Sequence, residues 1–267
     1  MAWTKIKTAI VVGAVLLLAA GATTVTVKEI RERQTYPWQT QNVSTDTLRK
    51  VSPQVMIVPA KYPGTIGGGV VWLNDGGVPG GDQVLGIGQS IQDIVSSAYG
   101  QSLERTVFPD NLPKGKFDFI ANLPSENRAA LQNEIKKRFG LVARSETRPT
   151  DVLLLQVQHR NATGLKLNDP RLLDPHSSSS GRSGAGYFTS KNQQISNLAR
   201  FLEDRFKIPV IDQTGLTKNY DIDLKWDESD YQHPNLDGLK EALSEDLGLV
   251  LISDNEPVEM LVVEKVN

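Results

Sequence analysis

Two aspartates and two threonines frame a short polar segment in the last third of the chain. Residues 212–217 read DQTGLT, and Asp221 follows four residues later. Carboxylates and hydroxyls at this spacing suit a small polar pocket, in which Asp212, Thr214 and Asp221 would bind a ligand by hydrogen bonds. The same residue types also build Asx and ST turns, in which side-chain oxygens accept hydrogen bonds from nearby backbone N–H groups. The sequence leaves both interpretations open.

Other residue types that carry chemistry give weaker patterns. The chain has no cysteine, and none of its three histidines has a second histidine or a carboxylate at metal-ligand spacing on one predicted element. The tripeptide SDN at 253–255 occurs without the S-x-x-K and K-T-G elements that accompany it in penicillin-recognising enzymes. We therefore expect no metal, no cofactor and no enzymatic activity.

The elements that would position these residues occur twice in the sequence. Leu131–Val142 aligns with Leu239–Val250 without a gap, with agreement at the glycine and at the apolar positions. Upstream, FDF at 117–119 matches YDI at 220–222. Such self-similarity indicates an internal duplication.

Carried further, the alignment places Pro149 on Pro257 and brings together charges of opposite sign. The basic residues Lys137, Arg138 and Arg148 of the first copy correspond to Glu245, Asp246 and Glu256 of the second. Independent variation of two solvated surfaces explains this reversal. The alternative is that the basic face of the first copy docks on the acidic face of the second, within a chain or between chains, with the charges setting the register.

Each copy predicts two amphipathic helices on a small sheet. In the second copy, Ser190 and Gln193 form a capping-box pattern before apolar residues that recur at helical spacing. Asn235 would begin the next helix and Gly248 would end it in the left-handed conformation. Strands are predicted at 187–189, 209–211, 220–225, 249–251 and 260–263, with a turn over 253–257 joining the last two. The fold class is therefore α+β: two tandem β-α-β-β-α-β-β repeats behind an N-terminal hydrophobic helix.

Composition divides the chain into five parts. We expect a transmembrane anchor or signal segment at 1–28, a Pro/Gly-rich tether at 29–82, repeat 1 at 83–166, a Ser/Gly-rich linker at 167–186 and repeat 2 at 187–267.

The N-terminal segment determines the predicted location. No residue from Thr8 to Val27 is charged, and as a helix this stretch would be roughly 30 Å long, the thickness of the hydrocarbon layer. An uncleaved anchor is favoured over a signal peptide cleaved near Ala20–Ala22. Lysines and arginines flank both ends, so they do not settle the orientation. The short basic start favours export, which predicts a single-pass cell-membrane protein with a periplasmic body, or a secreted protein if the segment is cleaved.

The second copy also resembles a large uncharacterised protein family abundant in soil bacteria. The family's pattern runs as a helix end DRF, a VVDKTGLTGRYDF-like stretch, a helix ending LGL and a close similar to PVEVLVIDHVEKP. In this chain the corresponding residues are DRF at 204–206, VIDQTGLTKNYD at 210–221, LGL at 247–249 and PVEMLVVEKV at 257–266. The resemblance covers about residues 50 to 266 and implies an exported, membrane-associated protein of unknown function. The first copy has NLPKG at 111–115 in place of the TGLT turn.

The order of elements in each repeat is also similar to the short N-terminal domain of secretins and TonB-dependent receptors, which implies a periplasmic interaction module. A net charge of −2 provides no basic field for nucleic acid. We therefore expect a non-enzymatic envelope protein with a membrane contact through its N-terminal helix and a protein partner. The alternative is a small-ligand binder or hydrolytic enzyme that uses a cleft between the repeats.

Overall fold

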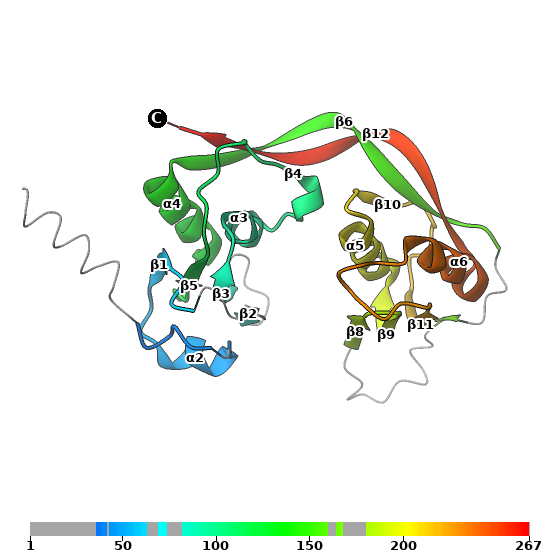
Figure 1. Cartoon of the computed structure of the whole chain (residues 1–267), viewed down its shortest axis with the longest axis horizontal. Coiled ribbons are helices and arrows are strands. Elements are labelled where there is room, and N and C mark those ends of the chain that lie inside the picture. Colours follow the sequence, from blue (N-terminus) through cyan, green and yellow to red (C-terminus); the bar gives the residue numbers. More distant parts are fainter. Residues whose placement is uncertain are drawn as a thin grey trace, which may run out of the picture. The chain divides into compact units, whose positions relative to one another are not determined.

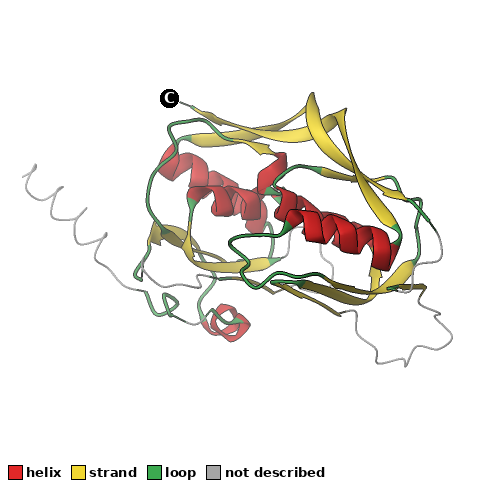
Figure 2. Ribbon diagram, turned by 45° about the vertical axis from the view of Figure 1, so that its right-hand side comes forward, coloured by secondary structure: helices red, strands yellow, loops and turns green. Residues whose placement is uncertain are grey.

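The computed structural model describes residues 36–41, 43–62, 69–73, 82–159, 164–167 and 180–266. Within these ranges the protein is α+β, with twelve strands in three sheets and five α-helices (Figures 1 and 2). The predicted N-terminal anchor lies outside the described residues, and no helix within them has the length and apolarity to cross a bilayer. Contacts divide the chain into two units: unit 1 is Met1–Gln101, Phe108–Ala143 and Val263–Asn267, and unit 2 is Ser102–Val107 and Arg144–Val262.

Unit 1 is built on an antiparallel sheet. Its order is β1 (Val55–Pro59), β5 (Phe117–Ala121), β3 (Gln83–Gln89) and β2 (Val70–Leu73). Helices α3 (Ile91–Tyr99) and α4 (Asn127–Phe139) pack on one face. A capping box between Ser90 and Asp93 begins α3, and the left-handed Gly100 ends it.

The chain that precedes these strands covers the other face of the same sheet (Figure 1). Leu48 lies in helix α2 (Thr45–Lys50), and Trp38 precedes this helix. Both side chains are almost fully buried against Leu85 and Ile120. Composition indicated a tether at 29–82, but the described part of this stretch supplies α2, β1, β2 and a buried tryptophan to unit 1. Proline and glycine here mark turns between short elements, and so they do not indicate an unstructured segment.

Unit 2 contains a second antiparallel sheet. Its order is β7 (Leu165–Leu167), β11 (Asn219–Lys225), β9 (Tyr187–Gln194) and β8 (Ser180–Gly184). Helices α5 (Ile195–Phe206) and α6 (Leu236–Leu247) pack on it through a core of aliphatic and aromatic side chains. Strand β8 lies in the stretch 167–186 that composition indicated as a linker.

The third sheet has the order β10 (Val210–Asp212), β6 (Leu141–Val157), β12 (Leu249–Lys265) and β4 (Thr106–Val107), and the short helix η1 (Leu103–Arg105) precedes β4. Strand β10 runs parallel to β6, and β4 runs parallel to β12. Apart from η1, the elements from β3 to β6 and those from β9 to β12 follow the same order, β-α-β-β-α-β.

The predicted turn at 253–257 is wrong, because β12 is one strand of 17 residues. Ser145 donates a hydrogen bond to Glu259 at 3.0 Å, and Asn255 donates one to Asp151 at 2.8 Å. These contacts show that β6 and β12 run in opposite directions. Polar residues are extended here because the neighbouring strand forms hydrogen bonds with their backbone N–H and C=O groups. This pairing does not require the side chains to be buried.

The helix ends of the second copy were predicted with mixed success. Asn235 accepts a hydrogen bond from Gly238 N as the N-cap of α6, and Gly248 ends that helix with φ +63°, both as predicted. The capping box at Ser190 and Gln193 is wrong, because β9 continues to Gln194 and α5 begins after it without a side-chain cap.

Candidate functional site

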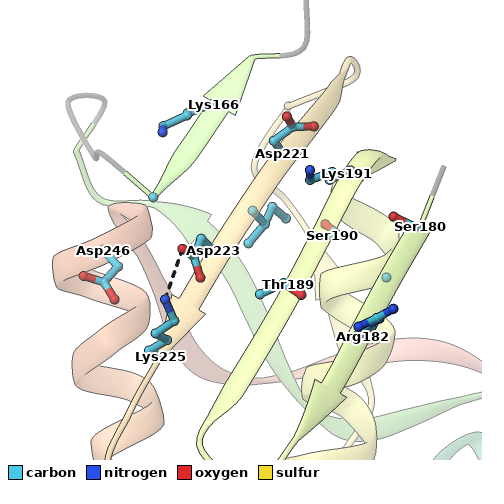
Figure 3. A pocket seen from close by; sticks show the side chains of 13 residues that line it. Lys166, Ser180, Arg182, Thr189, Ser190, Lys191, Asp221, Asp223, Lys225 and Asp246 are labelled. Carbon is cyan, nitrogen blue, oxygen red and sulfur yellow. Dashed lines mark hydrogen bonds and ion pairs between the residues drawn. The ribbon is translucent and has the colours of Figure 1, made fainter. Parts of the chain in front are cut away.

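A cavity of about 1000 Å³ lies on the face of the β7-β11-β9-β8 sheet that α5 and α6 do not cover (Figure 3). Along β11, the buried Tyr220, Ile222 and Leu224 belong to the core, and the residues between them point the other way. Charged and hydroxyl side chains dominate the lining; they are Lys166, Ser180, Arg182, Thr189, Ser190, Lys191, Asp221, Asp223, Lys225 and Asp246.

Strand register determines which of these side chains are neighbours. Thr189 on β9 has Asp223 of β11 on one side and Arg182 of β8 on the other. Lys191 lies opposite Ser180. Cross-strand partners point to the same side of a sheet, so Arg182 and Lys191 each have a hydroxyl as their neighbour across the β8–β9 pair.

The charged side chains of the cavity differ in their partners. Lys225 Nζ lies 3.3 Å from Asp223 Oδ2, and Asp221 Oδ1 accepts a hydrogen bond from Asn192 N at 2.8 Å. Lys166, Arg182 and Lys191 form no side-chain hydrogen bond or ion pair with another residue of the described ranges. Within the described ranges, the cavity therefore presents three cations without a side-chain partner beside Asp221 and Asp223, which have partners.

Asp221 has a counterpart in unit 1 at the position that the sequence alignment gives it. Asp118 Oδ1 accepts a hydrogen bond from Gly88 N at 2.8 Å, and both Gly88 and Asn192 have positive φ at an irregularity in their strand. The other oxygen of Asp118 accepts from Gln39 Nε2 at 2.8 Å and from Lys61 N at 3.0 Å. Gln39 belongs to the segment that covers the sheet of unit 1, and Lys61 lies just after β1. Asp118 is fully buried, whereas Asp221 lines a cavity.

Two of the three residues of the predicted pocket contact each other. Asp212 Oδ1 accepts hydrogen bonds from Thr214 N at 2.9 Å and from Thr214 Oγ1 at 2.6 Å, and Leu216 N donates to Thr214 Oγ1 at 3.1 Å. These contacts are those of an Asx turn followed by an ST turn. Asp221 lines the cavity, whose lining includes neither Asp212 nor Thr214. A ligand bound by all three residues stays a prediction.

The residues of the charge reversal have local contacts in their own units. Lys137 lies 3.7 Å from Glu134, Arg138 lies over the ring of Phe139, and Arg148 lies 2.7 Å from Glu146. Hydrogen bonds from Arg148 and Arg144 lower the pKa of Glu146 below its ordinary value. In the second copy, Glu245 is exposed, Glu256 is half-buried and Asp246 lines the cavity. Docking of one face on the other stays a prediction.

A buried ion pair at the DRF motif was missed by the sequence patterns. Arg205 Nη2 lies 2.5 Å from Glu228 Oε1, and the two side chains are 2% and 1% exposed. Glu228 also accepts hydrogen bonds from Trp226 Nε1 and Asn235 N, both at 2.9 Å. Burial alone would raise the pKa of Glu228, but these hydrogen bonds and Arg205 outweigh it and hold the pKa below its ordinary value. Charge counting could not find this pair, because it does not distinguish a buried arginine from a solvated one.

The neighbouring residues of the motif have structural contacts too. Burial alone would raise the pKa of Asp204, but hydrogen bonds from Lys207 and from Tyr231 Oη, the latter at 2.9 Å, outweigh it, so the pKa lies below its ordinary value. The Tyr231 ring lies 4.2 Å from the guanidinium carbon of Arg205. The motif thus fixes the loop after β11 to helix α5.

A metal site would need several histidine or acidic side chains close together. Among the described residues, no three His, Asp or Glu side chains are grouped so as to hold a metal ion. His233 Nδ1 lies 2.6 Å from Asp230 Oδ2, and both side chains are largely exposed.

Comparison with known proteins gives one match. The profile of a family described as "Protein of unknown function (DUF3738)" matches residues 92–266. The chain belongs to this family. No curated protein matches the chain, and no solved structure matches it. The DUF3738 region includes the cavity, the buried Arg205–Glu228 pair and the long strands β6 and β12, whereas α2, β1, β2 and β3 precede it.

Proposed function

We propose that this DUF3738 protein is a membrane-anchored, non-enzymatic protein of the cell envelope that binds a protein partner through the cavity face of the β7-β11-β9-β8 sheet. The observation that carries the proposal is the contrast between the two antiparallel sheets. Both faces of the β1-β5-β3-β2 sheet are packed, one by α3 and α4 and the other by the segment with Trp38. The cavity face of the second sheet has no such cover from the described residues.

The chemistry of this face favours a protein partner. Pockets for small molecules are concave and mostly apolar, whereas this cavity spans four strands and is lined by charged and hydroxyl groups. Interfaces of non-obligate protein complexes are about as polar as the rest of the surface, and complementary charges across them steer association and set the register.

Two further features support the rest of the proposal. The shared order of elements from β3 to β6 and from β9 to β12 supports a duplicated module, of the kind found in the short N-terminal domain of secretins and TonB-dependent receptors. The uncharged stretch from Thr8 to Val27 supports an anchor that keeps the body at the membrane, exported to the periplasm. Cleavage of that stretch would give a secreted protein with the same binding face.

The volume of the cavity also favours a second candidate. At about 1000 Å³ it would accommodate a polar small molecule, and the protein would then be a ligand-binding protein.

One experiment separates these functions. The full chain with a C-terminal affinity tag is crosslinked in intact cells, recovered from the membrane fraction, and each captured protein is purified and tested for binding to the full chain. The proposal expects a captured protein that binds again in purified form, and that binds at least tenfold more weakly when Thr189 is replaced by Arg. Recovery from the soluble cytoplasmic fraction, or the absence of any protein that rebinds, would contradict it; binding of a small molecule from a cell extract would favour the second candidate.

A further inference from the structure

Arg182 and Lys191 define a subsite for one negatively charged group. Both are exposed, and both lie on the cavity face of adjacent strands. They are diagonal neighbours, since Lys191 is paired with Ser180 and Arg182 with Thr189. Diagonal neighbours on an antiparallel pair lie roughly 7–8 Å apart, a spacing at which two long cationic side chains can bind one oxyanion between them. The hydroxyls of Ser180 and Thr189 add two hydrogen-bond donors beside it (Figure 3).

The neighbouring acids indicate a carboxylate and argue against a phosphate. Asp223 is the cross-strand partner of Thr189, so its negative charge, which the exposed ion pair with Lys225 offsets only in part, lies next to the subsite. A phosphate ester carries about −1.5 to −2 charges near neutral pH, and repulsion by Asp223 would oppose it more strongly than a carboxylate with a single charge. The two parallel N–H donors of an arginine can bind either a carboxylate or a phosphate, so the charge of Asp223 is what distinguishes the two. Asp221 farther along the face and Asp246 near the end of α6 favour a positive charge on the same ligand.

Unit 1 indicates what kind of molecule carries these charges. There, the corresponding sheet face is covered by a peptide segment, and Asp118 accepts a hydrogen bond from the side-chain amide of Gln39 in that segment. Asp221 is at the corresponding position of the cavity face. A peptide segment therefore fits the geometry of this kind of sheet face.

We infer that the cavity face binds a peptide segment of a protein partner in which a Glu or Asp carboxylate, held by Arg182 and Lys191, is flanked by a basic residue. This inference rests on the proposed function and assigns the chemistry of its partner. Lys166 provides a further positive charge at the β7 edge for a second acidic residue of the segment.

The test uses the isotope-labelled full chain in detergent and NMR titration with blocked heptapeptides. The first peptide has one glutamate and one lysine two positions apart; matched peptides have glutamine or phosphoserine in place of the glutamate, and inorganic phosphate is a separate probe. We expect the glutamate peptide to shift the amide signals of Thr189 and Lys191. The variant Arg182→Ala/Lys191→Ala should weaken its binding roughly tenfold, since each exposed ion pair contributes up to about a factor of five.

The control variant is Arg49→Ala/Lys240→Ala, which removes the same charge at two exposed positions outside the cavity and should leave binding within twofold. Equal binding of the glutamine peptide, tighter binding of phosphoserine or phosphate, or unchanged binding by the Arg182/Lys191 variant would overturn the inference. Crosslinks from position 189 to residues 168–179 of the same chain would also overturn it, because the occupant would then be internal. If a protein partner rebinds the full chain independently of Arg182 and Lys191, the proposed function stands and this inference fails; if no partner exists, both fail.

Discussion

Asp221 accepts a hydrogen bond from the backbone N–H of Asn192 at 2.8 Å, at the irregularity where β9 departs from its register with β11. Asp118 makes the same contact with Gly88 in unit 1. Asp118 is then buried by a segment of its own chain, whereas Asp221 lines an open cavity. Two similar local structures thus differ in what covers them, and the proposed binding face follows from this difference.

The buried pair of Arg205 and Glu228 predicts a large effect of a small substitution. Glu228→Gln leaves the arginine charge buried without a counter-charge, in a site where Arg205 Nε already has no hydrogen-bond partner among the described residues. Removal of one partner of a buried ion pair costs about 3–5 kcal/mol. Urea denaturation of the full chain measures the change in the free energy of unfolding.

The control for this prediction is Asp237→Asn, which breaks an exposed pair with Lys240. Exposed pairs contribute about 0–1 kcal/mol, so this variant should unfold at nearly the wild-type urea concentration. Equal effects of the two substitutions would contradict the structural role of the buried pair.

The carboxylates of Glu228 and Asp204 predict how the stability of the folded protein depends on pH. The pKa values of Glu228 and Asp204 are lower in the folded protein than their ordinary values of 4.5 and 3.8. A lowered folded pKa gives a stabilisation that is complete above the ordinary pKa and is lost as pH falls through the folded pKa. Unfolding midpoints measured from pH 7 down to pH 3 should therefore fall most steeply below about pH 4.5. Glu228→Gln should flatten this fall, whereas Glu241→Gln, on the exposed side of α6, should not.

Gly248, which ends α6, and Gly215 have similar φ angles, but substitution by alanine should destabilise the protein by different amounts at the two positions. Gly248 has φ +63°, and a Cβ there would clash with the carbonyl oxygen of His159. Gly215 has φ +67° with nothing within 4 Å of a Cβ. Gly215→Ala should cost about 1–2 kcal/mol from backbone strain alone. Gly248→Ala should cost about 1–3 kcal/mol more, because the clash adds to the strain. Thermal unfolding of both variants compares them, and equal losses would show that the contact with His159 is absent.

Unit 2 includes residues that precede the second sequence repeat, and this predicts the behaviour of fragments. Leu153 and Leu155 of β6 belong to the core beneath α5 and α6, and β6 pairs with β10. The second repeat alone, 187–267, lacks β6 and should show no cooperative thermal transition by circular dichroism. A fragment that begins at residue 141 restores β6 and should unfold cooperatively. A cooperative transition in the shorter fragment would contradict the contribution of β6 to the core of unit 2.

Much of the fold was predictable because helix periodicity and helix caps are local patterns in the sequence. The alignment of the chain with itself gave further information of the same kind. Helices α5 and α6, the strand β11 and the left-handed Gly248 follow from spacing of apolar residues and from one glycine. The long strands β6 and β12 did not follow, since their polar middle parts are extended only because each has the other as a neighbour. The burial of Trp38 was missed for a similar reason, because the surface that buries it comes from distant strands.

The candidate site was less predictable than the fold. Of the three residues chosen for a pocket, only Asp221 lines the cavity, because Asp212 and Thr214 satisfy each other within a turn. Arg182 lay in a stretch whose Ser/Gly composition indicated a linker, and only the register of β8 with β9 places it beside Lys191. Cross-strand neighbours depend on register, and neither composition nor periodicity determines the register of a strand rich in serine and glycine.

The most direct measurement of the central claim places a photo-crosslinking amino acid at single positions of the full chain in intact cells. Position 189 lies on the cavity face, and position 241 lies on the exposed side of α6. We predict that position 189 crosslinks to one envelope protein and that Arg182→Ala/Lys191→Ala reduces the yield severalfold, with little or no crosslinking from position 241. Equal crosslinking from both positions, or none from position 189 beyond the background of untreated cells, would contradict a partner-binding role for this face.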